Sequence, residues 1–165
     1  MNRAAAIILC AGKGTRMGLS DRSKVCYDCA GVPVIKRIVR NMREGGVGRF
    51  VIVVGHMAES VMSVLDDEPG VVYAFQKEQK GTGHAAQCGL RVLKDIGFSG
   101  PVIISMGDKI VAPRVVRSLL QPSNSQTLKP SSLSTAPSDR QAMLDDPKLN
   151  DILDAIPGAT VADIK

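Results

Sequence analysis

The sequence predicts an α/β domain over residues 1–120, in which helices cover both faces of a mainly parallel sheet (three layers, α/β/α). Short apolar runs alternate with amphipathic helical stretches, and glycine or proline separates them. Such alternation specifies right-handed βαβ crossovers, which place parallel strands side by side. Hydrophobic residues make up 44% of the 165 residues and aromatic residues only 3%, so the predicted core is aliphatic.

The first strand is expected at residues 4–10 (AAAIILC), a buried run that ends before Gly12. Pro33 opens a helical pattern that stops at Gly45-Gly46, with one apolar face formed by Val34, Ile35, Ile38, Val39 and Met42. Further strands are expected at residues 50–54, 71–75 and 101–105, and further helices at about 58–65 and from 82 or 83 to about 94.

The remaining residues differ in composition. Residues 121–139 are rich in Ser, Pro, Thr and Gln, which predicts a linker. Residues 140–165 are expected to form a weakly helical tail, in which Pro147 interrupts an amphipathic pattern over 140–156.

Charge favours a small polyanionic ligand. The net charge is +5, and Lys13, Arg16, Arg22 and Lys24 crowd one glycine-rich loop. Because no long basic run is interleaved with aromatic residues, we expect no nucleic-acid partner. No signal peptide or membrane span is apparent, so we expect a cytoplasmic protein without a membrane partner.

The four cysteines are expected to be thiols. Cys26-x-x-Cys29 has the spacing of half a zinc site, but no second Cys or His pair follows it. Packing of two small side chains is therefore the preferred interpretation.

A glycine-rich loop follows the first strand at residues 9–18. Glycines let backbone N–H groups approach phosphate oxygens, and such loops bind ligands at the carboxyl ends of parallel strands. The spacing does not fit a Walker A loop. A dinucleotide fingerprint would need glycine where Met17 stands, and an acid where Gly55-His56 follows the second strand. A surface loop with incidental charges remains the alternative.

The loop resembles the signature of sugar-nucleotide pyrophosphorylases, Leu-Ala-Ala-Gly-x-Gly-Thr-Arg-Met followed by Pro-Lys. Lys24 matches the lysine, Ser23 replaces the proline, and Gly31-Val32-Pro33 matches the family's Gly-x-Pro. Within the family, Ala-Gly-Lys-Gly-Thr-Arg-Met is most similar to the bacterial N-acetylglucosamine-1-phosphate uridylyltransferases. The resemblance implies a Rossmann-like, GT-A-like nucleotidyltransferase fold. It also implies a triphosphate site at Leu9, Ala11, Gly12, Lys13, Gly14 and Thr15.

A second glycine motif, Gln79-Lys80-Gly81-Thr82-Gly83-His84-Ala85, follows the third strand. The amide of Gln79 can donate and accept, as reading a pyrimidine edge requires. The resemblance implies uracil contacts from Gln79, Gly81 and Thr82. The alternative for Thr82 is a helix N-cap without a ligand role. His56 and His84 lie at a turn and at a helix start, and we expect neither to be catalytic.

Asp108 ends the fourth strand, opposite the phosphate loop. Mg²⁺ prefers carboxylate and phosphate oxygens, and the family's Gly-Asp at this point supplies a metal ligand, which implies Mg²⁺ at Asp108. The residue that follows, Lys109, departs from the commoner small or apolar residue there.

The implied reaction is uridylyl transfer from UTP to a sugar 1-phosphate, N-acetylglucosamine-1-phosphate, with release of pyrophosphate. Arg16 and Lys24 would stabilise the developing charge as catalytic residues. The resemblance covers about residues 4–120, and the sugar pocket and second metal ligand are expected to be missing or diverged. A nucleotide-binding module without turnover and a cytidylyl- or guanylyltransferase remain alternatives, and a homo-oligomer is left open.

Overall fold

The structure is a computed structural model that describes residues 4–12 and 21–121. Its elements, in chain order, are β1 (Ala4–Leu9), the 3₁₀ helix η2 (Lys24–Cys26), β2 (Asp28–Cys29), β3 (Val32–Pro33), α1 (Val34–Glu44), β4 (Val47–Val54), α2 (Ala58–Val64), β5 (Val71–Phe75), α3 (Gly81–Asp95), β6 (Val102–Met106) and α4 (Pro113–Leu120). The expected linker and helical tail lie outside the described residues.

Four parallel strands form the main sheet, in the order β5-β4-β1-β6, and β2 pairs with β3 in a short antiparallel hairpin. The chain moves outward from β1 through β4 to β5, and then returns to place β6 on the other side of β1. The strand order therefore reverses between β1 and β6, the place where open α/β sheets bind ligands.

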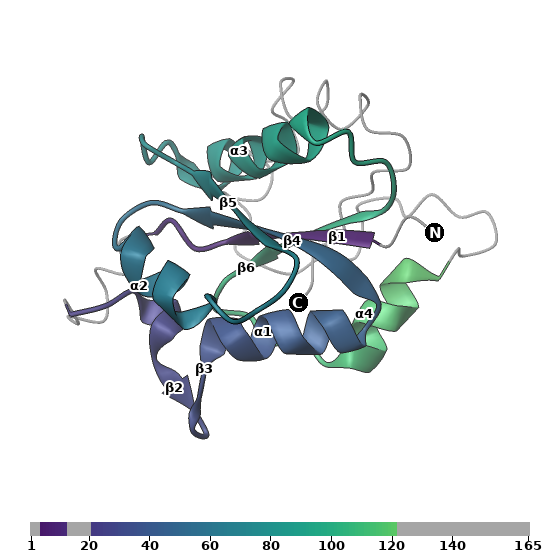
Figure 1. Cartoon of the computed structure of the whole chain (residues 1–165), viewed down its shortest axis with the longest axis horizontal. Helices are drawn as coiled ribbons and strands as arrows, with labels where there is room; N and C mark the ends of the chain where they lie inside the picture. The colour runs from purple at the N-terminus through teal and green to yellow at the C-terminus, as the bar shows by residue number, and fades with distance from the viewer. Residues whose placement is uncertain (1–3, 13–20, 122–165) are drawn as a thin grey trace.

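Helices cover both faces of this sheet, with α3 on one side and α1, α2 and α4 on the other (Figure 1). The strand β1 shows why both faces are buried, because its side chains alternate between two hydrophobic clusters. Together with the two residues that follow β1, one face contributes Ala4, Ala6, Ile8 and Cys10, and the other contributes Ala5, Ile7, Leu9 and Ala11. The predicted three-layer fold is confirmed.

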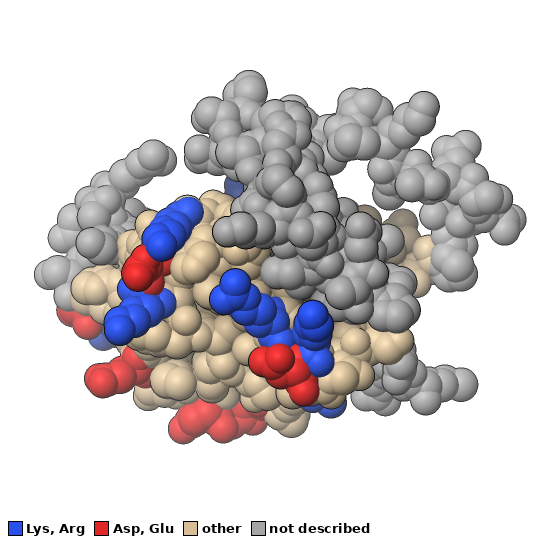
Figure 2. Space-filling model, turned by 90° about the horizontal axis from the view of Figure 1, so that it is seen from above, with Lys and Arg blue, Asp and Glu red and all other residues tan. Residues whose placement is uncertain are grey.

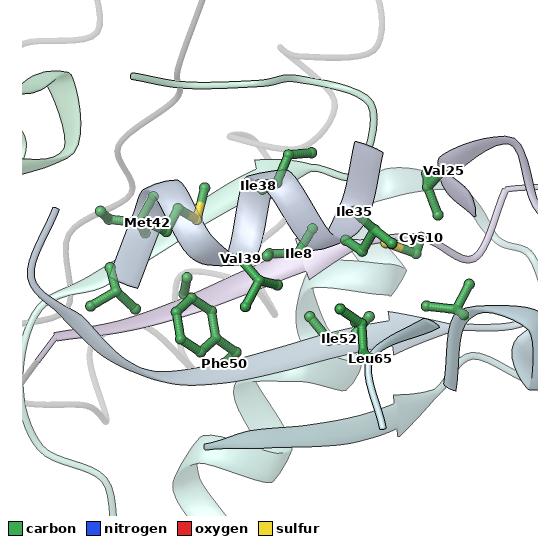
Figure 3. Close-up of a cluster of buried hydrophobic side chains, with 14 of the residues drawn as sticks. Ile8, Cys10, Val25, Ile35, Ile38, Val39, Met42, Phe50, Ile52 and Leu65 are labelled. Carbon is green, nitrogen blue, oxygen red and sulfur yellow. The ribbon is translucent and has the colours of Figure 1, made fainter. Parts of the chain in front are cut away.

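The apolar face predicted for α1 is also confirmed at four positions. Ile35, Ile38, Val39 and Met42 are fully buried, and they pack over the strands in the cluster that contains Phe50 (Figure 3). Full burial of each such side chain is worth about 1.5–3 kcal/mol in transfer free energy. The stability of α1 therefore comes mainly from packing its apolar face against the sheet.

Several boundaries and elements differ from the sequence-based expectation. β4 begins at Val47 rather than at residue 50, β1 ends at Leu9, and α3 begins at Gly81. The helix α4, the hairpin β2–β3 and η2 were not predicted. α4 contacts the end of α1 so closely that a Cβ at Gly45 would lie 2.4 Å from Cβ of Val116.

Charged side chains of both signs lie next to one another on the described part of the α3 side of the molecule (Figure 2). Among the described residues, no helix has the length and apolar character needed to cross a membrane.

Candidate functional site

The two glycine motifs and Asp108 follow strands whose carboxyl ends lie at one edge of the sheet. Leu9 pairs with Val53 of β4 and with Met106 of β6, and Val54 pairs with Phe75 of β5. Because the four strands are parallel and end almost level, the loops after β1, β5 and β6 emerge together.

Gly107 brings the β6 loop against the β1 loop. Its N–H donates to the carbonyl of Leu9 at 2.9 Å, which extends the β1–β6 pairing by one residue. A Cβ at this position would lie 2.5 Å from Sγ of Cys10 and 3.0 Å from the Leu9 carbonyl oxygen. Only glycine fits without displacement, and the next residue, Asp108, is thereby placed where the strand order reverses.

Asp108 and Lys24 form a salt bridge at this point, with Nζ of Lys24 2.7 Å from Oδ2 of Asp108. Their side chains are 42% and 33% exposed, so both charges can reach a ligand. Lys24 is presented by η2, whose next two residues, Val25 and Cys26, are buried in the core. The structure thus brings together two of the residues predicted from separate motifs.

A neutral thiol lies beneath this pair. Burial raises the pKa of the Cys10 thiol far above its usual range, and the neighbouring Asp108 carboxylate raises it further. Cys10 therefore stays protonated at neutral pH and acts as packing beneath the charged pair.

Gln79 connects the two glycine motifs. Its Nε2 donates to the carbonyl oxygen of Ala11 at 2.8 Å, across 68 residues of sequence. One donor of the amide is therefore used to join the two loops. The predicted contact with a base remains a prediction.

The turn between β5 and α3 depends on a buried amide that sequence reasoning missed. Gln76 is 4% exposed, and its Nε2 contacts the carbonyl oxygen of Gly81 and Nδ1 of His84, each at 3.1 Å. Gly81 has a φ of +90°, which favours glycine. The sequence signal that could have found Gln76 is its position as a polar residue directly after the strand β5.

The start of α3 differs from the capping alternative given for Thr82, whose ligand role stays a prediction. The N-cap is Lys80, without a side-chain capping bond, and α3 begins at Gly81. The interpretation of Thr82 as an N-cap is therefore wrong, because Thr82 lies inside the first turn. Of the two histidines, His84 is hydrogen-bonded to Gln76 and His56 is exposed.

The structure does not describe four of the predicted site residues, Lys13, Gly14, Thr15 and Arg16. Their predicted contacts with a triphosphate therefore stay predictions.

In the described ranges, no group of three or more Cys, His, Asp or Glu residues is arranged to hold a metal ion. Cys26 is buried and Cys29 exposed, which places the two thiols of the Cys-x-x-Cys motif in different surroundings.

Comparison with known proteins gives consistent matches. The family model of the MobA-like NTP transferase domain matches residues 6–144. Bifunctional protein GlmU of Geotalea uraniireducens (strain Rf4) is 45% identical over 108 residues, which are 66% of this chain and 23% of that protein. The family match extends past residue 120 into the segment expected to be a linker.

Two solved structures share the fold. A nucleotidyl transferase from Methanothermobacter thermautotroptrophicus aligns with a TM-score of 0.60 and 22% identity, over 74% of this chain and 58% of that one. The inositol-1-phosphate CTP transferase from T. maritima aligns with a TM-score of 0.59 and 25% identity, over 72% and 49%. The predicted GT-A-like nucleotidyltransferase fold is confirmed. This chain spans about a quarter of the length of the curated relatives, 23% and 26% for two of them.

Proposed function

The chain belongs to the MobA-like NTP transferase domain family, and from this membership we propose that it transfers a uridylyl group from UTP to a sugar 1-phosphate. The acceptor we propose is N-acetylglucosamine-1-phosphate, and the second product is pyrophosphate. The observation that carries the proposal is the salt bridge between Lys24 and Asp108 at the reversal of strand order.

This pair has the chemistry that a metal-bound triphosphate needs. A carboxylate binds a hard cation, and a lysine ammonium next to it binds phosphate oxygens. Lys24 contacts only Oδ2 of Asp108, so Oδ1 remains available as a ligand atom among the described residues. Mg²⁺ is commonly held by one or two carboxylates together with phosphate oxygens, so the single carboxylate fits this ion.

The reaction would be a displacement at the α-phosphorus of UTP. An oxygen of the sugar phosphate forms a bond to that phosphorus, and the bond to the oxygen of the β-phosphate breaks to release pyrophosphate. Mg²⁺ at Asp108 would neutralise phosphate charge. Lys24 and Arg16 would stabilise the charge that develops on the transferred and leaving phosphates, while Lys13 and the loop amides would hold the β- and γ-phosphates.

Base recognition would come from the second motif. Gln79 is tied to the carbonyl of Ala11, so the side chain proposed to read the base is held next to the residue that precedes Gly12. Oε1 of Gln79 and the backbone of Gly81 and Thr82 would then face the uracil edge.

We further propose that the reaction takes place in the cytoplasm, because all four cysteines are free thiols.

Two other functions are alternatives to this proposal. The CTP transferase from T. maritima shares the fold, which favours a cytidylyltransferase as the second candidate. A nucleotide-binding module is the other alternative, and it predicts UTP binding without release of pyrophosphate.

A pyrophosphate-release assay tests the proposal against both. The four nucleoside triphosphates are combined with several sugar 1-phosphates, with and without Mg²⁺, and binding of each triphosphate is measured by calorimetry. We expect Mg²⁺-dependent release with UTP. Turnover with CTP alone would favour the second candidate, and UTP binding without pyrophosphate release would favour the binding module.

A further inference from the structure

Ser23, which directly precedes Lys24, carries a backbone N–H where the pyrophosphorylase signature has proline. Ser23 is 5% exposed, so this N–H needs a partner inside the protein. It donates to the hydroxyl of Ser60 on α2, with Ser23 N and Ser60 Oγ 3.1 Å apart. The carbonyl of Ser23 accepts from the N–H of Cys26 at 2.9 Å, so both backbone groups before Lys24 are anchored.

The Ser60 hydroxyl uses its complete hydrogen-bonding capacity at this junction. It donates to the carbonyl oxygen of Met57 at 2.8 Å, and it accepts from Ser23 N–H and from the Cys26 thiol, with Sγ 3.8 Å away. One hydroxyl offers one donor and two acceptor sites, so all three are taken. Burial raises the pKa of the Cys26 thiol, which keeps it protonated and able to donate.

The Met57 contact ties this hydroxyl to the start of α2. Met57 has a φ of +58°, in the left-handed region, and it is the N-cap of α2. The bond to the Met57 carbonyl uses the one donor of the Ser60 hydroxyl, so the hydroxyl can meet the Ser23 N–H only as an acceptor.

We propose that Ser60 is a positioning residue: by accepting the Ser23 N–H it holds η2 so that Lys24 faces Asp108, at the position where the pyrophosphorylase signature has proline. The proposal rests on the function proposed above, because it assigns Lys24 to a ligand site.

The backbone angles of Ser23 are compatible with the proline that the signature has at this position. Its φ of −59° and ψ of 139° are angles that proline adopts without strain. Its own hydroxyl is buried and has no hydrogen-bond partner among the described residues, so the side chain adds nothing that proline would lose. Proline at this position would remove the N–H that Ser60 now satisfies, and Ser60 would keep its bond to Met57.

A double-mutant cycle on the whole chain tests the proposal, with Ser60→Ala, Ser23→Pro and the double variant. Mg²⁺-UTP affinity is measured by calorimetry, and amide hydrogen exchange is followed over residues 22–26. Ser60→Ala leaves a buried N–H unpaired, so we expect affinity about tenfold weaker and faster exchange. Ser63→Ala, which removes an exposed hydroxyl from the same helix, serves as the matched control and should change neither quantity.

In the Ser23→Pro background, we expect Ser60→Ala to cost less than about threefold in affinity, since no N–H is left to satisfy. Equal losses in both backgrounds, or an unchanged affinity in Ser60→Ala, would overturn the proposal. If Ser60→Ala does not fold, Ser60→Thr keeps the hydroxyl, and it should preserve slow exchange at residues 22–26. If the wild-type chain binds no nucleotide, the proposed function fails, and slow exchange lost in Ser60→Ala would then show the anchoring by itself.

Discussion

Lys24 and Asp108 are 84 residues apart in sequence, yet Nζ of Lys24 lies 2.7 Å from Oδ2 of Asp108. Lys24 comes after the loop that follows β1 and Asp108 comes after β6, and the parallel sheet brings them together at the carboxyl ends of these two paired strands. The pair sets opposite charges side by side at a surface that a metal-bound triphosphate can reach. Its response to substitution therefore separates a ligand site from an ordinary surface ion pair.

Asp108→Asn should remove the Mg²⁺ dependence of UTP binding and leave the fold intact. Asparagine keeps the shape of the side chain and loses the charge that a hard cation requires. Titrations of UTP with and without Mg²⁺ against both proteins provide the measurement, and thermal unfolding provides the control. A metal dependence that is the same in both proteins would exclude Asp108 from the site.

Lys24→Gln should weaken Mg²⁺-UTP binding by about tenfold or more, because an ammonium that contacts phosphate is worth about 1.5–3 kcal/mol as a charged hydrogen-bond donor. Thermal stability should change little, since the salt bridge is partly exposed. Lys94→Gln, at the exposed end of α3, removes the same charge elsewhere and should bind like the wild type. Equal losses in both variants would indicate a general charge effect.

Mg²⁺-UTP should bind more tightly than Mg²⁺-ATP, and Gln79→Leu should reduce this preference. The substitution removes the amide that would read the base and also the bond that joins Gln79 to Ala11. Calorimetry with both nucleotides measures the ratio of affinities. Equal affinities for UTP and ATP in the wild type would contradict the base assignment.

Gly107→Ala should destabilise the fold by about 1–3 kcal/mol, the typical cost of overpacking a filled core. The new Cβ would lie 2.5 Å from Sγ of Cys10 and 3.0 Å from a backbone oxygen. Gly12→Ala is the control for stability, because a Cβ there would have no neighbour within 4 Å among the residues that the structure describes. Urea unfolding of the three proteins gives the comparison, and equal midpoints would show that the β6 turn relaxes easily.

Glu68→Gln should lower the free energy of unfolding at pH 7 by about 1–3 kcal/mol, less than for a fully buried pair because Arg40 and Arg43 are partly exposed. Burial by itself would raise the pKa of Glu68, but hydrogen bonds from Arg43 and Arg40 outweigh it and hold the pKa below its ordinary value. A lowered folded-state pKa contributes stability above the unfolded pKa of about 4.3, and this contribution is lost as pH falls through the folded value.

The difference between wild type and Glu68→Gln should therefore shrink as urea unfolding is repeated from pH 7 down to pH 3. Asp67→Asn breaks an exposed ion pair with Lys36 and should have a smaller effect throughout. A difference for Glu68→Gln that persists unchanged at low pH would show that shape rather than charge explains its effect.

Local pattern was enough to predict the layered fold. The buried run of β1 and the apolar face of α1 follow from hydrophobic periodicity, which depends on residues a few positions apart. The short helix α4 was missed because eight residues are marginal as a helix alone, and its stability comes from packing Val116 against Gly45. Gln76 was missed since only the folded turn shows that its amide is buried against Gly81 and His84.

The sequence by itself determined the α/β alternation, the glycine motifs after β1 and β5, and the aspartate after β6. Each of these features is recognised from residues that are close together in the sequence. Only the tertiary structure decided that Lys24 meets Asp108, that Gln79 joins Ala11, and that Ser60 satisfies Ser23. These contacts depend on the strand order β5-β4-β1-β6 and on how deeply each loop is buried. Such properties arise from the packing of segments that are distant in sequence, and no local pattern specifies them.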